Sequence, residues 1–249
     1  MTNLIAIFKI FNYFLITFLY FPVVSIAYLL FGGNSKQLSF FVQGWAKTVL
    51  FLLNLKIIKT GQLSDHNPKI LASNHVGFLD IPIYLTFVPT AFLAKKSVMY
   101  WPVIGLGAKF IGTIFVDRKD PKSRSSALEK ISKFLIKSKR TLVIFPEGTT
   151  NTWGKKWKWG SFKLASKHSF PLQTAVLLYN KPYQVSYEGN QTFFSQLWKI
   201  AKLKNLSCEI KFMDVFENID DPEKVCAITE EKAHHAQRTH LKSVGYKNN

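Results

Sequence analysis

A histidine and an aspartate separated by four residues follow one apolar run of the chain. His75 and Asp80 belong to the segment Asn74-His75-Val76-Gly77-Phe78-Leu79-Asp80. A carboxylate beside an imidazole can fix the tautomer of the ring and stabilise the protonated form. Such a ring could take the proton of a hydroxyl group that attacks a thioester, and a positioned base contributes about 10²- to 10⁴-fold in rate. The pair is therefore a candidate for general-base catalysis, although the same spacing alone is a weak signal.

An acid and a glycine end a second apolar run. The segment reads Phe145-Pro146-Glu147-Gly148-Thr149-Thr150. Pro146 cannot donate to a sheet ladder, and Gly148 permits close approach of the backbone to a ligand. Each motif alone has a simpler interpretation, either a capping aspartate near a surface histidine or a loop with a solvated acid. Together they favour one site that holds an oriented base and a backbone-rich pocket.

The surrounding residues predict how these side chains are positioned. Leu71 and Ala72 are strand-like, so His75 should emerge at the end of a strand, where open α/β sheets bind ligands. Asp80 precedes Ile81 and a proline, which is tolerated in the first turn of a helix, so Asp80 should start a helix. No serine or cysteine has the context of a nucleophile elbow, which favours direct attack over a covalent acyl-enzyme.

Short apolar runs alternate with helical patterns from residue 56 onward. The expected strands are 56–59, 69–73, 91–94, 113–116, 142–145, 174–178 and 209–215. The expected helices are 81–87, 123–139, 161–167 and 222–241. This alternation predicts an α/β fold with a mixed sheet flanked by helices. We see no internal repeat and no linker, so residues 56–249 are expected to form one catalytic domain.

The N-terminal 55 residues are expected to form a membrane-anchoring helical hairpin. Residues 10–31 carry no charge, and a helix of that length reaches roughly 33 Å, against about 30 Å for a hydrocarbon core. Gly32 and Gly33 break the run, and a second apolar stretch follows at 38–55. The hairpin could span the membrane twice or dip into one leaflet, because Lys47 could snorkel from a shallow position.

Two other interpretations of the N-terminus are weaker. A cleaved signal peptide is disfavoured because Lys9 is the only early basic residue and the apolar stretch is too long. A buried helix pair in a soluble protein remains an alternative. Lys56, Lys59 and Lys69 follow the hairpin, so the positive-inside tendency predicts a catalytic domain on the cytoplasmic face, as at a bacterial inner membrane.

The charge balance indicates anionic partners. The 249 residues include 33 Lys and Arg against 15 Asp and Glu, a net charge of +18, and 47% are hydrophobic. Nucleic acid is disfavoured because an apolar N-terminus accompanies the charge, whereas a membrane with acidic lipids accounts for both. Cys208 and Cys226 are too few for a disulfide framework, which favours a reducing compartment.

Two clusters of aromatic or titratable residues have alternative interpretations. Trp153, Trp157 and Trp159 alternate with lysines, which is compatible with single-stranded nucleic acid but fits a membrane interface better. His234, His235 and His240 could suggest a metal site, but adjacent histidines point in different directions on a helix and no carboxylate spacing supports a cluster, so solvated histidines are expected.

Four blocks of the chain resemble the glycerolipid acyltransferase family typified by 1-acylglycerol-3-phosphate O-acyltransferase. Two are the segments around His75 and Glu147, which lie about 70 residues apart. The third contains Arg118, in Gly112-Thr113-Ile114-Phe115-Val116-Asp117-Arg118. The fourth is Phe170-Pro171-Leu172-Gln173-Thr174-Ala175-Val176. Lys95 precedes a further similar stretch, Trp101-Pro102-Val103-Ile104-Gly105. The resemblance covers roughly residues 56–180 and implies the fold of that family.

The resemblance also implies roles for individual residues. His75 would be the general base and Asp80 its orienting partner. Arg118 would bind the phosphate of the acceptor, for which its planar fork is suited. The remaining substrate-binding residues would be Asn74, Lys95, Glu147, Gly148 and Thr149. No metal and no other cofactor is implied.

The implied reaction moves a fatty acyl chain from acyl-CoA or acyl-carrier protein to a lysophospholipid. The first expectation for the acceptor is 1-acylglycerol-3-phosphate, which would give phosphatidic acid. Two departures leave lyso-ornithine lipid or another lysolipid open: Thr150 stands where members that form phosphatidic acid often have arginine, and Thr174 or Ala175 replaces a usual proline. The charge and hairpin alone would also fit a non-catalytic membrane lipid-binding protein.

Overall fold

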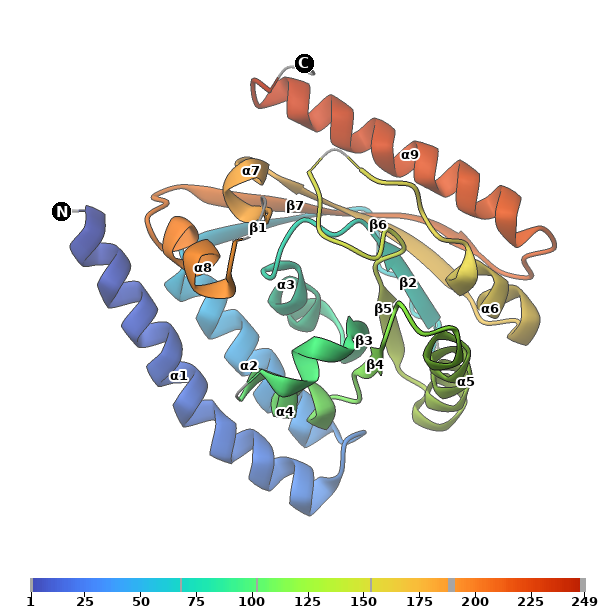
Figure 1. The fold of residues 1–249 in the computed structure, drawn as a ribbon, viewed down its shortest axis with the longest axis horizontal. Helices are drawn as coiled ribbons and strands as arrows, with labels where there is room; N and C mark the ends of the chain where they lie inside the picture. Colours follow the sequence, from blue (N-terminus) through green and yellow to red (C-terminus); the bar gives the residue numbers. More distant parts are fainter. Residues whose placement is uncertain (1, 68, 102, 153, 188–190, 247–249) are drawn as a thin grey trace.

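A seven-stranded mixed sheet forms the centre of the molecule (Figure 1). The computed structural model describes residues 2–67, 69–101, 103–152, 154–187 and 191–246. The strands are β1 Leu55–Thr60, β2 Lys69–Ser73, β3 Thr90–Lys95, β4 Ile114–Val116, β5 Thr141–Ile144, β6 Leu172–Tyr179 and β7 Leu206–Phe216. Their order is β1-β7-β6-β2-β5-β3-β4, and only the β6–β7 pair is antiparallel. The predicted mixed α/β architecture is confirmed.

Helices cover both faces of this sheet. They are α1 Thr2–Phe31, α2 Lys36–Leu52, α3 Asp80–Phe87, the 3₁₀ helix η1 Lys96–Tyr100, α4 Ile104–Phe110, α5 Pro121–Ser138, α6 Gly160–His168, α7 Pro182–Val185, α8 Phe193–Ala201 and α9 Pro222–Ser243. One hydrophobic core joins a sheet face to α1, α2, α3 and α8. A second core joins the other face to α5, α6 and α9, with α9 lying along β6 (Figure 1).

The central strands are buried on both faces, which explains their continuous apolar sequences. Leu71 of β2 and Val143 of β5 belong to the core with α2 and α3. Their neighbours Ile70 and Leu142 belong to the core with α5 and α9, because successive side chains of a strand point to opposite faces. All seven predicted strands and four predicted helices overlap elements of the structure, whereas η1, α4, α7 and α8 were not predicted.

The N-terminal hairpin forms as predicted, but its two helices have different environments. α2 buries Leu38, Val42, Ala46, Val49 and Leu50 in the same core as strands β2 and β5. The alternative of a core helix therefore describes α2. The division at residue 55 separates two segments of the chain and not two cores.

α1 lies against the rest of the molecule and is held near both ends. The Lys9 ammonium donates a hydrogen bond to the Leu203 carbonyl at 3.3 Å. In the turn after α1, the Gly33 carbonyl accepts a hydrogen bond of 2.7 Å from Arg140, which also donates to Thr90 at 3.2 Å. These contacts tie α1 to the C-terminal end of α8 and to the sheet.

The outer side of α1 is a long apolar stripe. Among the residues that the structure describes, one helix, Asn3–Phe31, is long and apolar enough to cross a membrane by length and composition. Its exposed large hydrophobic side chains recur along the whole helix: Leu4, Ile5, Ile7, Phe8, Phe11, Phe14, Leu15, Phe18, Leu19, Val23, Ile26, Leu29, Leu30 and Phe31. We call this set the α1 stripe.

Candidate active site

The two sequence motifs meet at one edge of the sheet. β2 and β5 are neighbouring parallel strands, so the loops that leave their carboxyl ends lie together. The Glu147 carboxylate accepts a 2.8 Å hydrogen bond from the His75 backbone N–H. The Asn151 backbone N–H donates to the His75 carbonyl at 2.8 Å. The second loop therefore holds the His75 backbone on both sides.

A fully buried carboxylate fixes the His75 ring. Asp80 is the first residue of α3 and has no exposed surface. Its Oδ2 lies 2.7 Å from His75 Nδ1 and accepts hydrogen bonds from the backbone N–H groups of Val76 at 2.7 Å and Gly77 at 3.1 Å. Its Oδ1 accepts a 2.7 Å hydrogen bond from the Tyr179 hydroxyl. When Nδ1 carries the proton that Asp80 accepts, Nε2 is the basic nitrogen of the ring.

The ring itself is packed on one face and partly open. It stacks on Phe145 with 4.0 Å between ring centroids and 11° between planes. The His75 side chain keeps 19% of its surface exposed. The imidazole is thus held rigidly by packing and hydrogen bonding, which is the condition for a general base.

His75 opens into a cavity of about 490 Å³ that has a polar side and an apolar side. Its polar lining side chains are His75, Lys95, Ser97, Arg118, Thr149, Thr150 and Tyr187. Aromatic side chains of α1, α2, α8 and the residue after η1 supply much of the apolar lining: Tyr13, Trp45, Phe193 and Trp101. A smaller apolar cavity of about 130 Å³ between α1, α2 and α4 shares the lining residues Trp45, Ile81 and Ile104 with it.

Three predicted site residues line this cavity together with His75. Lys95 ends β3 and is exposed, and Thr149 lies in the loop after β5. Arg118 donates a hydrogen bond from Nη1 to the Gly148 carbonyl. Burial lowers the pKa of Arg118, but guanidinium groups stay charged in proteins. The cavity therefore combines two cations with the His75 imidazole.

Asn74 and Gly148 have positioning contacts instead. The Asn74 side chain is fully buried. Its Nδ2 donates to the Leu177 carbonyl at 3.0 Å, and its Oδ1 accepts from the Leu177 N–H at 2.7 Å, which links the end of β2 to β6. Gly148 has φ +72°, and a Cβ there would lie 3.2 Å from Lys158 Nζ, so a glycine suits this turn.

Glu147 is also buried, with 5% of its surface exposed. Burial raises the pKa of Glu147 to about 8, although the nearby Asn151 side chain and the hydrogen bond from the His75 backbone oppose this rise. The Asp80 charge raises the pKa further. The carboxyl group links the two loops, and the neighbouring Thr149 and Thr150 line the cavity.

Several contributors to the site were not predicted. Tyr179 lies 99 residues from Asp80, to which it donates a hydrogen bond. Asn151 lies 76 residues from His75, whose carbonyl accepts its N–H. Tyr187 lines the cavity. The sequence offers one signal for Tyr179, which is a tyrosine at the end of an apolar strand. A buried tyrosine hydroxyl needs a hydrogen-bond partner, so such a residue is a candidate contact of a buried polar group.

One tryptophan differs from its sequence interpretation. Trp157 was expected at a membrane interface, but it is 3% exposed and packs against Phe162 in the core with α6 and α9. Trp159 is 40% exposed, and Trp153 lies outside the described residues. Within the described part of the chain, no three His, Cys, Asp or Glu side chains gather as a metal site would require.

A family of known proteins matches this part of the chain. The family described as Acyltransferase matches residues 54–178, about half of the sequence. The chain belongs to the acyltransferase family. The matched range contains every predicted site residue from Asn74 to Thr149 and excludes α1, α2, α8 and α9.

Two relatives carry names that specify a substrate. The lyso-ornithine lipid O-acyltransferase of Rhizobium meliloti is 29% identical over 147 residues, covering 58% of this chain and 50% of the relative. The 1-acyl-sn-glycerol-3-phosphate acyltransferase of Borreliella burgdorferi is 37% identical over 142 residues, covering 54% of this chain and 55% of the relative. The match thus spans about half the length of each relative.

A solved structure shares the fold of this family member. The crystal structure of the 1-acyl-sn-glycerophosphate (LPA) acyltransferase PlsC from Thermotoga maritima aligns with a TM-score of 0.62. The alignment covers 97% of this chain and 100% of that one, at 19% sequence identity. The likeness confirms the predicted glycerolipid acyltransferase fold.

The buried Glu147 predicts a specific dependence of stability on pH. Its pKa is about 8 in the folded protein, against a reference value of 4.5. The folded protein therefore retains a proton that the unfolded chain releases. The stabilisation is fully present below about pH 4.5 and is lost as the pH rises to about 8, by up to about 1.4 kcal/mol per pH unit.

Glu147→Gln keeps an oxygen that can accept the His75 N–H but cannot ionise. We expect its thermal midpoint to fall less than that of the wild type between pH 5 and pH 8, in matched detergent and buffer. Glu129→Gln, on the exposed face of α5, is the control and should follow the wild type. Parallel curves for the wild type and Glu147→Gln would contradict the assignment.

Proposed function

We propose that this protein is a membrane-bound O-acyltransferase that moves an acyl chain from a thioester to the free hydroxyl of a lysophospholipid. The observation that carries the proposal is the His75–Asp80 pair, 2.7 Å apart, at a cavity that also contains Arg118 and Lys95. Asp80 is the orienting partner in this mechanism, and His75 is the general base.

The proposed step needs no covalent enzyme intermediate. The acceptor oxygen attacks the thioester carbonyl carbon as His75 Nε2 removes the hydroxyl proton, and the oxygen–carbon bond forms. The carbon–sulfur bond then breaks, and the imidazolium returns the proton to the thiolate that leaves. Asp80 stabilises the imidazolium between these two events, because its carboxylate faces the opposite ring nitrogen.

The lining of the cavity supports an anionic, acylated acceptor. Arg118 and Lys95 supply two cations, and a guanidinium group can hold a phosphate through two parallel hydrogen bonds. The aromatic lining and the adjoining apolar cavity suit hydrocarbon chains. We therefore propose 1-acylglycerol-3-phosphate as the acceptor and acyl-CoA or acyl-carrier protein as the donor. Lyso-ornithine lipid is the second candidate, because a relative carries that name.

The structure favours one of the two membrane arrangements expected from the sequence. α1 packs along α2, α4 and α8, and the contacts of Lys9 and of Gly33 hold it on the domain. We propose that α1 lies in one leaflet with its exposed stripe toward lipid, and that the cavity draws its acceptor from the bilayer. The positive-inside tendency favours the cytoplasmic face.

Removing the base should abolish the reaction. We expect His75→Ala to lower kcat by about 10²- to 10⁴-fold, and Asp80→Asn to lower it by a similar order because the amide no longer stabilises the imidazolium. The measurement is the transfer of a labelled acyl group to lysolipid in washed membranes at matched protein levels. His66→Ala, at an exposed histidine, is the control. Full activity of His75→Ala would exclude this mechanism. If the protein were instead a non-catalytic lipid-binding scaffold, the wild type itself would give no product.

Arg118→Lys tests the phosphate contact. A lysine keeps the charge but loses the planar fork, so we expect the KM for lysolipid to rise about tenfold while the KM for the acyl donor is unchanged. Lys119→Arg, the reverse exchange at the next, exposed position, should change neither value. A rise confined to the KM of the donor would assign Arg118 to the donor's phosphates instead.

The α1 stripe should anchor the protein. Burial of one phenylalanine contributes about 1.5–3 kcal/mol, so replacing Phe8, Phe11 and Phe18 with serine should weaken membrane binding strongly. We expect the wild type to stay with membranes through a high-salt wash, because hydrophobic insertion is insensitive to salt. The triple variant should appear in the wash. Ile136→Ser with Ile228→Ser, exposed on α5 and α9, is the matched control, and release of this control variant would argue against α1 as the anchor.

A further inference from the structure

The loop that holds His75 depends on contacts from outside itself. It connects β5 to α6 over residues 145–159 and contains no helix or strand in its described part. A loop of this length lacks a ladder of its own hydrogen bonds, so tertiary contacts must define its shape. Its contacts with His75, through Glu147 and Asn151, are therefore only as rigid as the rest of the loop.

Helix α9 supplies two of these tertiary contacts. The Glu230 carboxylate accepts a 3.1 Å hydrogen bond from the Trp157 backbone N–H. The His234 ring packs directly on Gly154, where an added Cβ would lie 2.3 Å from His234 Cδ2. Glu230 Oε1 and His234 Nδ1 are 3.8 Å apart. The two side chains, one helical turn apart, thus form one contact surface against the loop.

Gly154 and Trp157, the two loop residues that α9 contacts, are connected to His75 through other residues of the loop. The Gly154 N–H donates a 2.6 Å hydrogen bond to the Asn151 side chain, and the Asn151 N–H donates to the His75 carbonyl at 2.8 Å. The side chains of Trp157 and Asn151 also interact with Glu147 and lower its pKa, and Glu147 accepts the hydrogen bond from the His75 N–H. Two short paths therefore connect α9 to the two backbone groups of His75.

We propose that Glu230 and His234 are positioning residues for His75, and that α9 sets the placement of the base through the loop 145–159. The inference rests on the proposed role of His75. It concerns residues beyond the matched family range of 54–178. Neither side chain lines the cavity at His75, so both act through the loop and not on substrate.

The placement of His75 matters because proton transfer tolerates only a small change in the distance between donor and acceptor. A general base must come within about 2.6–3.2 Å of the proton-bearing atom. A displacement of about 1 Å can cost about 10²-fold in rate. A loosened loop would let the His75 backbone shift while the Asp80 hydrogen bond stays formed.

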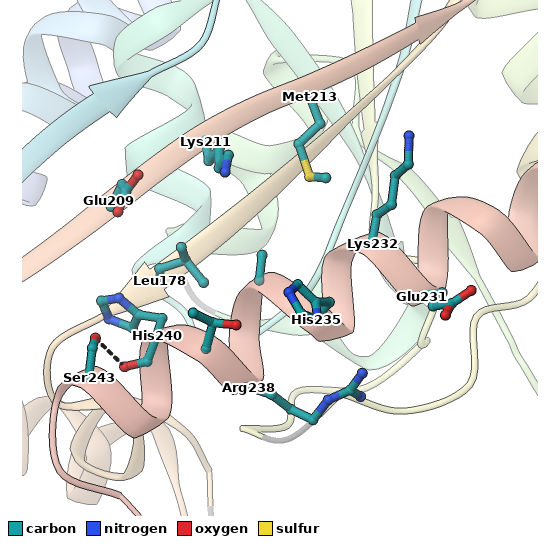
Figure 2. Close-up of a pocket in the computed structure, with 12 residues that line it drawn as sticks. Leu178, Glu209, Lys211, Met213, Glu231, Lys232, His235, Arg238, His240 and Ser243 are labelled. Carbon is teal, nitrogen blue, oxygen red and sulfur yellow. Dashed lines mark hydrogen bonds between the residues drawn. The ribbon is translucent and has the colours of Figure 1, made fainter.

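The adjacent residues of α9 provide matched controls. Glu231 and His235 follow Glu230 and His234 directly, and about 100° of helical rotation separates neighbours. Both control residues are exposed and line a groove of about 630 Å³ between α9 and strands β6 and β7 (Figure 2). They share the helix, the residue types and the charges of the pair that contacts the loop.

The first experiment compares Glu230→Ala with Glu231→Ala in acyl transfer from washed membranes. We expect Glu230→Ala to lower kcat at least tenfold, with the KM values of donor and acceptor within about twofold of wild type, and Glu231→Ala to change neither. Glu230→Gln keeps an oxygen acceptor for the Trp157 N–H, so its kcat should stay within about threefold of wild type. His234→Ala and His235→Ala should differ in the same direction.

The second experiment measures hydrogen exchange without turnover. Backbone amides of residues 148–158 should exchange faster in Glu230→Ala than in Glu231→Ala, while those of α3 stay unchanged. Equal kcat in Glu230→Ala and Glu231→Ala would overturn the proposal, whatever the exchange. Should Glu230→Ala fail to fold, Glu230→Asp against Glu231→Asp carries the same comparison.

Different results would contradict the proposed function and the positioning role of α9. Full activity of His75→Ala removes the proposed function and with it the positioning role. An enzyme that requires His75 but is indifferent to Glu230 and His234 removes the positioning role alone.

Discussion

Two buried carboxyl groups contact one histidine, Asp80 at its ring and Glu147 at its backbone, and the rest of the structure accommodates this constraint. A buried charge is costly unless it is hydrogen-bonded or neutralised. Asp80 accepts four hydrogen bonds, from three neighbouring residues of its own loop and from Tyr179. Glu147 follows the other course, since its raised pKa keeps it largely protonated near neutral pH. The two acids can therefore occupy one small volume while serving different parts of His75, its ring and its backbone.

The sheet brings these acids together. β2 lies between β5 and β6, so the loop with His75 has the Glu147 loop on one side and Tyr179 on the other. Asn74 fastens β2 to β6 by two hydrogen bonds to one residue, Leu177. The central strands β2 and β5 are buried on both faces and apolar in their interior positions, and the polar groups of the site follow where these two strands end. The candidate site therefore lies at the edge of the sheet where the carboxyl ends of these strands meet.

The sequence predicts the strands and the motif residues because both depend on short-range patterns. Buried central strands read as continuous apolar runs, and Asp80 precedes a proline that marks a helix start. Contacts between distant residues left no such pattern: Tyr179 and Asp80 are 99 residues apart, and Glu230 and Trp157 are 73 apart. α8 was missed because Ser195 closes its capping box in place of the usual glutamate or glutamine. Hydropathy also could not distinguish α1 from α2, because it counts apolar residues without showing what covers them.

The attachment of α1 at both ends has a consequence for how such a protein meets different membranes. A helix that crosses a bilayer must match its thickness, and a mismatch is relieved by tilting or by local thinning. A helix held along a domain by Lys9 and by Arg140, and resting in one leaflet as proposed, would have no opposite surface to reach. Its depth would depend on the width of the helix and not on the thickness of the bilayer. Changes in the acyl-chain length of the surrounding lipids would therefore leave the position of the cavity relative to the lipid headgroups unchanged. An enzyme that alters membrane composition would then be insulated from the thickness changes caused by its own products.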